Sequence, residues 1–150
     1  MSRIMALIAG LVLAATLLIA EGCSKKAEST ARTSAPVAEI AVIGHGEKVK
    51  LTDHLVPGKT TVVDFYSEYC GGCQMLAPEL EKLVRQRPDI AVVKVDVNRP
   101  EVEGRIDWDS PVAQQYGLES LPHLVVFDPD GTVKASGDRA LDLVLGWLEA

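Results

Sequence analysis

Two cysteines separated by two glycines, Cys70-Gly71-Gly72-Cys73, stand between a predicted strand and a predicted helix. The preceding residues 62–65 are apolar apart from one aspartate, a pattern typical of a buried strand. Apolar side chains then recur at helical spacing over residues 75–84. The cysteines therefore begin a helix, where free amide N–H groups and the helix dipole favour a thiolate at Cys70. Because the spacing lets Cys73 reach back to Cys70, the pair can alternate between dithiol and disulfide.

The same cysteine spacing also occurs in metal sites and haem attachment sites. A structural zinc ion needs four ligands, and the only other cysteine of the chain, Cys23, lies far away near the N-terminus. Covalent haem attachment needs a histidine directly after the second cysteine, where this chain has Gln74. The pattern therefore favours redox chemistry, with no metal and no cofactor expected.

Residues 61–78, with the sequence TVVDFYSEYCGGCQMLAP, resemble the thioredoxin family. The family pattern is a Val-Asp-Phe strand end, an aromatic residue, Cys-Gly-Pro-Cys and a proline within the helix. The positions that match it are Asp64, Tyr69, Cys70, Cys73 and Pro78. Gly72 departs from it, since the family usually has proline there, and Gln74 replaces a common basic residue. The resemblance extends from about residue 37 to the C-terminus.

The order of predicted elements is that of a thioredoxin fold, which is an α/β fold. Strands are predicted at residues 39–43 and 48–51, forming a short N-terminal insert that ends in a capped helical turn at 52–55. The order strand, helix, strand, helix, strand, strand, helix follows. Its later strands are 90–97, 124–127 and 132–135, and a short helix capped by Asp109 or Ser110 ends at Gly117. We expect a central mixed sheet flanked by helices on both faces.

The resemblance assigns roles to the reactive residues. Cys70 would be the nucleophile and Cys73 the resolving cysteine. Asp64 would be a buried acid that exchanges a proton with Cys73 through water, with a pKa raised by burial. A solvated aspartate at a strand edge is the alternative for Asp64. Lys94 in the next strand would moderate the pKa of that acid, or would be an ordinary surface lysine.

Leu121-Pro122-His123 stands where the family has a cis-proline that faces the disulfide. The backbone of Leu121 would then pair with an extended substrate segment. An ordinary trans proline at the start of an edge strand is the alternative. His123 would tune the cysteine pair or serve as a neutral packing residue. The predicted substrate-binding residues are Tyr69, Gly71, Gly72, Leu121, Pro122 and His123.

The N-terminus predicts export and membrane attachment. Residues 4–20 are apolar or small apart from one threonine, and Arg3 precedes them, which is typical of a secretory signal. Ala20-Glu21-Gly22 before Cys23 resembles the bacterial lipobox, whose cysteine is lipidated. The alternative, an uncleaved membrane anchor, is disfavoured because the positive charges lie mostly after the apolar run. We predict a signal segment at 1–22, a flexible tether at 23–36 and the folded domain at 37–150.

The expected protein is a thiol–disulfide oxidoreductase of the bacterial cell envelope, membrane-anchored and facing the periplasm. Its partners would be envelope proteins that carry cysteines, with apocytochrome c as one candidate, and a membrane redox protein that recycles the pair. A net charge of −6 and a pI near 5.0 argue against a nucleic-acid partner. The alternative function is a tethered, non-catalytic binding module in which the disulfide is merely structural.

Overall fold

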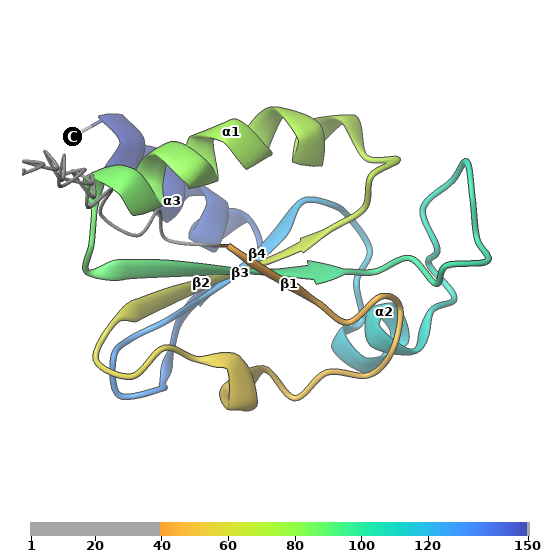
Figure 1. Ribbon diagram of the computed structural model, residues 1–150, viewed down its shortest axis with the longest axis horizontal. Coiled ribbons are helices and arrows are strands. Elements are labelled where there is room, and N and C mark those ends of the chain that lie inside the picture. The colour runs from red at the N-terminus through yellow and green to blue at the C-terminus, as the bar shows by residue number, and fades with distance from the viewer. Residues whose placement is uncertain (1–39, 150) are drawn as a thin grey trace, which may run out of the picture. The chain divides into compact units, whose positions relative to one another are not determined.

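A single mixed sheet organises the structure, a computed structural model that describes residues 40–149. Its strands lie in the order β1-β3-β2-β4-β5 (Figure 1). Their bounds are β1 Ala41–Ile43, β2 Thr60–Tyr66, β3 Ile90–Asp96, β4 His123–Phe127 and β5 Val133–Ser136. Strands β1, β3 and β2 run parallel, whereas β4 and β5 are antiparallel to their neighbours. The predicted sheet is thereby confirmed, with strand ends that differ from the predictions by one or two residues.

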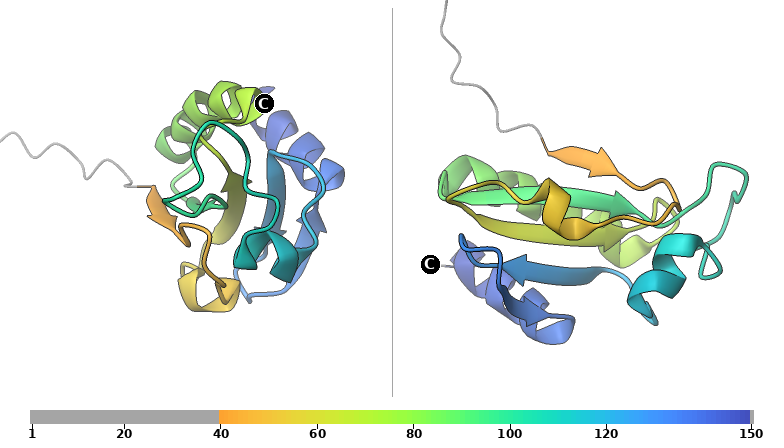
Figure 2. Two further views of the ribbon diagram at one scale, coloured as in Figure 1. Left: turned by 90° about the vertical axis from the view of Figure 1, so that its right-hand side faces the viewer. Right: turned by 90° about the horizontal axis from the view of Figure 1, so that it is seen from below.

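Helices cover both faces of this sheet, as expected. Their bounds are η1 Leu51–His54, a 3-10 turn, α1 Gly71–Gln86, α2 Pro111–Tyr116 and α3 Asp138–Glu149. Helices α1 and α3 lie on one face, and η1 and α2 lie on the other (Figures 1 and 2). The α1 helix is the crossover between the parallel strands β2 and β3. The order after the insert therefore matches the thioredoxin fold that the resemblance implied.

The alternation of side chains along β2 divides the core into two layers. Val62 packs with α1 and α3 in one cluster, whereas Val63 and Phe65 belong to the cluster on the α2 face. Because successive residues of a strand point to opposite faces, Asp64 shares the face of Val62. The carboxylate is consequently placed on the side of the sheet that α1 covers.

Local sequence signals set the ends of the short helix α2. The Oγ atom of Ser110 accepts the amide N–H of Ala113 at 3.3 Å, so Ser110 rather than Asp109 is the cap. At the other end Gly117 adopts a left-handed conformation with φ of 58°, which glycine tolerates without a Cβ clash. Both predicted ends of this helix are confirmed.

The predicted strand at 48–51 is wrong. The amide of Val49 donates to Oε1 of Gln115 at 3.0 Å, and its carbonyl accepts from Nε2 of the same side chain at 2.9 Å. The hydroxyl of Tyr116 donates to that carbonyl as well, at 2.6 Å. Side chains of α2 thus occupy the backbone groups that a neighbouring strand would pair with. Val49 and Leu51 are both buried, which explains the strand-like alternation in the sequence.

The turn that follows differs from its prediction in one detail. A helical turn is present, as η1, but its N-terminal flanking residue is Lys50, which makes no capping hydrogen bond through its side chain. The predicted side-chain cap is therefore wrong. The turn is held by its buried Leu51 instead.

Several predictions fall outside the part of the chain that the structure describes. The signal segment 1–22, the tether 23–36 and the lipidation site Cys23 all lie there, as does the predicted domain boundary at residue 37. Over residues 40–149, no helix is long and apolar enough to cross a membrane.

Candidate active site

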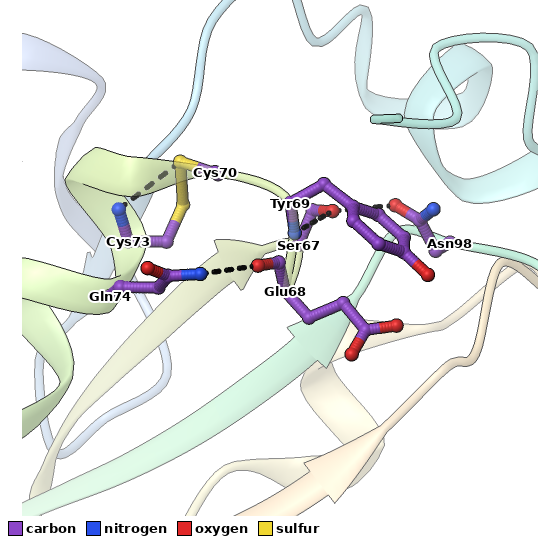
Figure 3. The surroundings of a disulfide bond; sticks show 7 residues. All are labelled: Ser67, Glu68, Tyr69, Cys70, Cys73, Gln74 and Asn98. Carbon is purple, nitrogen blue, oxygen red and sulfur yellow. Dashed lines mark hydrogen bonds between the residues drawn. A yellow bond between two sulfur atoms is a disulfide. The ribbon is translucent and has the colours of Figure 1, made fainter. Parts of the chain in front are cut away.

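The two cysteines are joined by a disulfide where β2 has ended and α1 begins (Figure 3). Their Cα atoms lie 5.3 Å apart, within the usual range for a disulfide. Cys70 is the N-cap residue of α1, and its Sγ accepts the amide N–H of Cys73 at 3.1 Å. The same N–H, together with the helix dipole, is in position to stabilise a thiolate at Cys70 once the disulfide is reduced.

Both cysteines are largely shielded from solvent. Cys70 is 5% exposed and Cys73 is 2% exposed, whereas Gly71 between them is exposed. Cys70 is thus the more exposed residue of the pair, as suits the predicted nucleophile. A partner that exchanges disulfides with this pair must therefore come close to a largely shielded sulfur.

A hydrogen-bonded network that sequence reasoning missed holds the turn before Cys70. The hydroxyl of Ser67 donates to Oδ1 of Asn98 at 2.7 Å and accepts the amide N–H of Tyr69 at 3.2 Å (Figure 3). The amide of Cys70 donates to the carbonyl of Ser67 at 3.1 Å. Ser67 and Asn98 lie just after the ends of β2 and β3. The sequence shows only that each follows a predicted strand, whereas the pairing of the two strands brings the side chains together. The network fixes the backbone that delivers Cys70 to the helix.

The same asparagine ties the loop after β3 to this turn. Its Nδ2 donates to the carbonyls of Val102 at 3.0 Å and Arg105 at 2.8 Å. Within the loop, the buried carboxylate of Asp107 accepts from Nε of Arg99 at 2.6 Å and from its terminal nitrogen at 3.0 Å. The hydrogen bond from Arg99 lowers the pKa of Asp107, outweighing the effect of burial. This long loop is therefore an ordered neighbour of the active-site turn.

Asp64 is buried, as predicted. It is 0% exposed, and neither carboxylate oxygen has a hydrogen-bond partner within residues 40–149. Burial raises the pKa of this carboxyl to about 6, and the positive charge of Lys94 partly opposes the effect. Lys94 is the residue opposite Asp64 in the pairing of β2 with β3. An acid with this pKa exchanges protons readily near neutral pH.

Lys94 is held in place by an aromatic ring. Its Nζ lies 3.9 Å from the ring centroid of Tyr66, within the range of a cation–π interaction. Burial raises the pKa of Tyr66 to about 12, and the nearby carboxylates of Asp96 and Asp64 add to the effect. Lys94 is thus a half-buried residue with an identifiable electrostatic effect on Asp64, rather than an ordinary surface lysine.

The bond between Leu121 and Pro122 is cis, as predicted. Pro122 lies against the cysteine loop, because a Cβ atom placed on Gly72 would stand 3.1 Å from Cδ of Pro122. A Cβ on Gly71 would meet nothing within 4 Å. The second glycine of the motif therefore makes the close approach to the proline, whereas the first faces open space. Leu121 is half-buried and packs against the core on the α2 face.

His123 turns away from the face that holds Asp64. Its Nε2 lies 3.2 Å from Oγ of Ser136, and its ring meets the ring of Phe65 edge-on with centroids 6.0 Å apart. Burial lowers the pKa of His123, with Asp138 acting in the opposite direction. These contacts favour a neutral packing residue over the alternative of a residue that tunes the cysteines.

Comparisons with known proteins agree with this architecture. The family model described as "Thioredoxin" matches residues 46–149. A thioredoxin of Chlamydia trachomatis is 36% identical over 75 residues, which cover 50% of this chain and 65% of that protein. A thioredoxin of Mycolicibacterium smegmatis is 33% identical over 95 residues, covering 60% and 79% of the two chains. The alignment thus spans less than two thirds of the chlamydial relative.

A solved structure is similar over most of its length. A mutant thioredoxin from Halobacterium salinarum aligns with a TM-score of 0.51 and 28% sequence identity, and the alignment covers 78% of this chain and 97% of that one.

The buried charge of Asp64 makes stability depend on pH. Folding raises the pKa of Asp64 from 3.8 to about 6. The contribution of Asp64 to the free energy of unfolding is therefore highest below pH 3.8 and falls as the pH rises through 6. At higher pH this loss of stability no longer changes with pH. Urea unfolding of the oxidised protein should show that the advantage of Asp64→Asn over wild type grows by roughly 2–3 kcal/mol between pH 4 and pH 8. An advantage that does not change with pH would mean that the carboxyl titrates normally.

Proposed function

Because the chain belongs to the thioredoxin family, we propose that it is a thiol–disulfide oxidoreductase acting through Cys70 and Cys73. The observation that carries the proposal is the disulfide at the start of α1, with the amide of Cys73 donating to Sγ of Cys70 at 3.1 Å. A thiolate at a helix N-terminus is stabilised, which makes it an effective nucleophile and leaving group at neutral pH.

The reaction is an exchange of disulfides in two steps. The Cys70 thiolate attacks a substrate disulfide, forms a mixed disulfide and releases one substrate sulfur as a thiolate. The Cys73 thiolate then attacks the sulfur of Cys70, closing the protein disulfide and releasing the second substrate thiolate. The substrate gains two electrons and the cysteine pair loses them. The same steps run backwards when the substrate is the stronger reductant.

Asp64 accepts the proton that Cys73 must lose before it can attack. Its pKa of about 6 suits this task, because a base works best when its pKa lies near the working pH. The absence of hydrogen bonds to its carboxylate oxygens within residues 40–149 leaves both free to bind a water molecule. Lys94 keeps the pKa from rising further.

Pro122 and the backbone of Leu121 bind the substrate segment around its cysteine. The support for this is the close approach of Gly72 to Pro122, which places the proline beside the disulfide. An extended segment would add along the backbone of Leu121, beside the exposed Gly71. The ring of Tyr69 points away from Cys70 towards Asn98, so it would contact a substrate only beyond the disulfide (Figure 3).

The roles of the two cysteines are tested by trapping. Cys73→Ser should accumulate mixed disulfides with a protein substrate, because nothing releases the substrate from Cys70. Cys70→Ser should accumulate none and serves as the matched control, since both variants keep one cysteine of the pair. Non-reducing electrophoresis with mass spectrometry identifies the adducts. Adducts on Cys73 in the Cys70→Ser variant would reverse the assignment.

The protein works in the bacterial cell envelope, tethered to a membrane and facing the periplasm. The support is the sequence before the described domain: an apolar run at residues 4–20 and Cys23 after small residues. The substrates are envelope proteins with cysteines, for which apocytochrome c is a candidate, and a membrane redox protein recycles the pair. Disulfides form and persist in such an oxidising compartment, so substrates for the exchange are present there.

Membrane attachment through Cys23 has its own test. Cys23→Ala should release the domain from the membrane fraction or leave an unprocessed precursor, because no lipid can then be attached. Fractionation and mass spectrometry of the mature N-terminus make the measurement, with Ser24→Ala as a control. Unchanged processing of the variant, with no lipid on the wild-type protein, would contradict lipidation.

A non-catalytic binding module remains the second candidate. The observation that favours it is the burial of both cysteines, at 5% and 2% exposure, because an inert structural bridge is typically shielded. The two candidates differ in how easily the disulfide is reduced.

A further inference from the structure

The turn of residues 67–70, which leads from β2 to the first cysteine, is held from two sides. On one side, the hydroxyl of Ser67 donates to Oδ1 of Asn98 at 2.7 Å (Figure 3). On the other side, Nε2 of Gln74 in α1 donates to the carbonyl of Glu68 at 2.6 Å. The amide of Cys70 closes the turn on the carbonyl of Ser67 at 3.1 Å. The chain before Cys70 therefore has a fixed path into the helix.

Asn98 uses every hydrogen bond that its side chain can make. Its Oδ1 accepts the hydroxyl of Ser67 and the amide of Asp107, the latter at 3.3 Å. Its Nδ2 donates to the carbonyls of Val102 and Arg105. A side-chain amide has two donors and two acceptor lone pairs, so none is left over. Because Asn98 is 6% exposed and Ser67 is 0% exposed, water does not replace these bonds, and the serine hydroxyl has one fixed acceptor.

The hydrogen bonds of this turn matter more to the reduced protein than to the oxidised one. In the oxidised protein the disulfide itself holds the Cα atoms of the two cysteines 5.3 Å apart. Reduction removes that bond, and the two glycines between the cysteines leave the backbone there with much conformational freedom. The turn then keeps the sulfur of Cys70 beside the amide of Cys73. Loosening the turn therefore destabilises the dithiol form more than the disulfide form.

We propose that Ser67 and Asn98 are positioning residues that hold the Cys70 thiolate against the amide of Cys73 after reduction and so make the disulfide more oxidising. The inference rests on the proposed function and adds a determinant of the redox balance to it. A hydrogen bond from the amide stabilises the thiolate. Because the reduction potential reports the balance between dithiol and disulfide, a stabilised thiolate shifts that balance towards the dithiol. The effect passes through the backbone of residues 67–70.

The test is the equilibrium of the full-length protein with glutathione. Two glutathione molecules give up two electrons to the protein disulfide, which yields the protein dithiol and glutathione disulfide. Ser67→Ala should lower the equilibrium constant for this reduction about tenfold, because the thiolate loses part of one hydrogen bond to a charged group. A tenfold change corresponds to a potential about 30 mV more reducing. The pKa of the Cys70 thiol, measured from the pH dependence of its alkylation, should rise in the same variant.

A matched control separates positioning from a general loss of stability. Thr61 is 1% exposed at the opposite end of β2, and its hydroxyl accepts the amide of Val56 at 3.1 Å. Thr61→Val removes that buried hydroxyl, so it should lower the free energy of unfolding in urea and leave the equilibrium constant with glutathione unchanged. Asn98→Ala should shift the constant in the same direction as Ser67→Ala. The double variant should go no further than Asn98→Ala alone, because both changes break the same bond.

The outcomes that overturn the proposal are distinct. An unchanged or increased equilibrium constant in Ser67→Ala, while wild type exchanges with glutathione, would refute the positioning role and leave the proposed function intact. An equal shift in Thr61→Val would assign the effect to lost stability and would refute the positioning role as well. A wild-type disulfide that does not exchange with glutathione would refute the proposed function itself.

Discussion

Strand β2 is the constraint on which the rest of the structure depends. It lies in the middle of the sheet, paired with β3 on one side and β4 on the other, and both of its faces are covered by packed side chains. A strand fixed on all sides has one register, and a slip by one residue would turn Asp64 to the opposite face. The position of Cys70 is therefore set by the core, through the Ser67 turn that follows the strand.

The charged residue in that strand is kept at a cost to stability. A carboxylate with no hydrogen bond in a buried position is unfavourable, which its raised pKa of about 6 expresses. The positive charge of Lys94, on the neighbouring strand β3, partly offsets the destabilisation by the buried carboxylate. The ammonium group of Lys94 itself lies over the ring of Tyr66. A side chain that destabilises the fold yet lies on the face beneath α1 is consistent with the role in cysteine chemistry that we propose for Asp64.

Much of this arrangement is visible in the sequence, because it follows from short-range patterns. The apolar run before Cys70, the helical spacing after Cys73 and the turn glycine Gly117 each act over a few residues. The wrongly predicted strand at 48–51 shows where such local patterns fail. The alternation of polar and apolar residues predicts the burial of Val49 correctly, but the backbone of Val49 bonds to the side chain of Gln115, 66 positions away. The Ser67–Asn98 bond likewise joins residues that only the folded chain brings together.

The reduction potential of the Cys70–Cys73 disulfide tests the central claim most directly. It is measured by equilibrating the protein with glutathione buffers of known potential and quantifying the free thiols. A catalytic cysteine pair should have a reduction potential between about −120 and −270 mV, the range of known thiol–disulfide oxidoreductases of this fold. A value below about −300 mV, typical of structural disulfides, would contradict the account and favour the non-catalytic binding module.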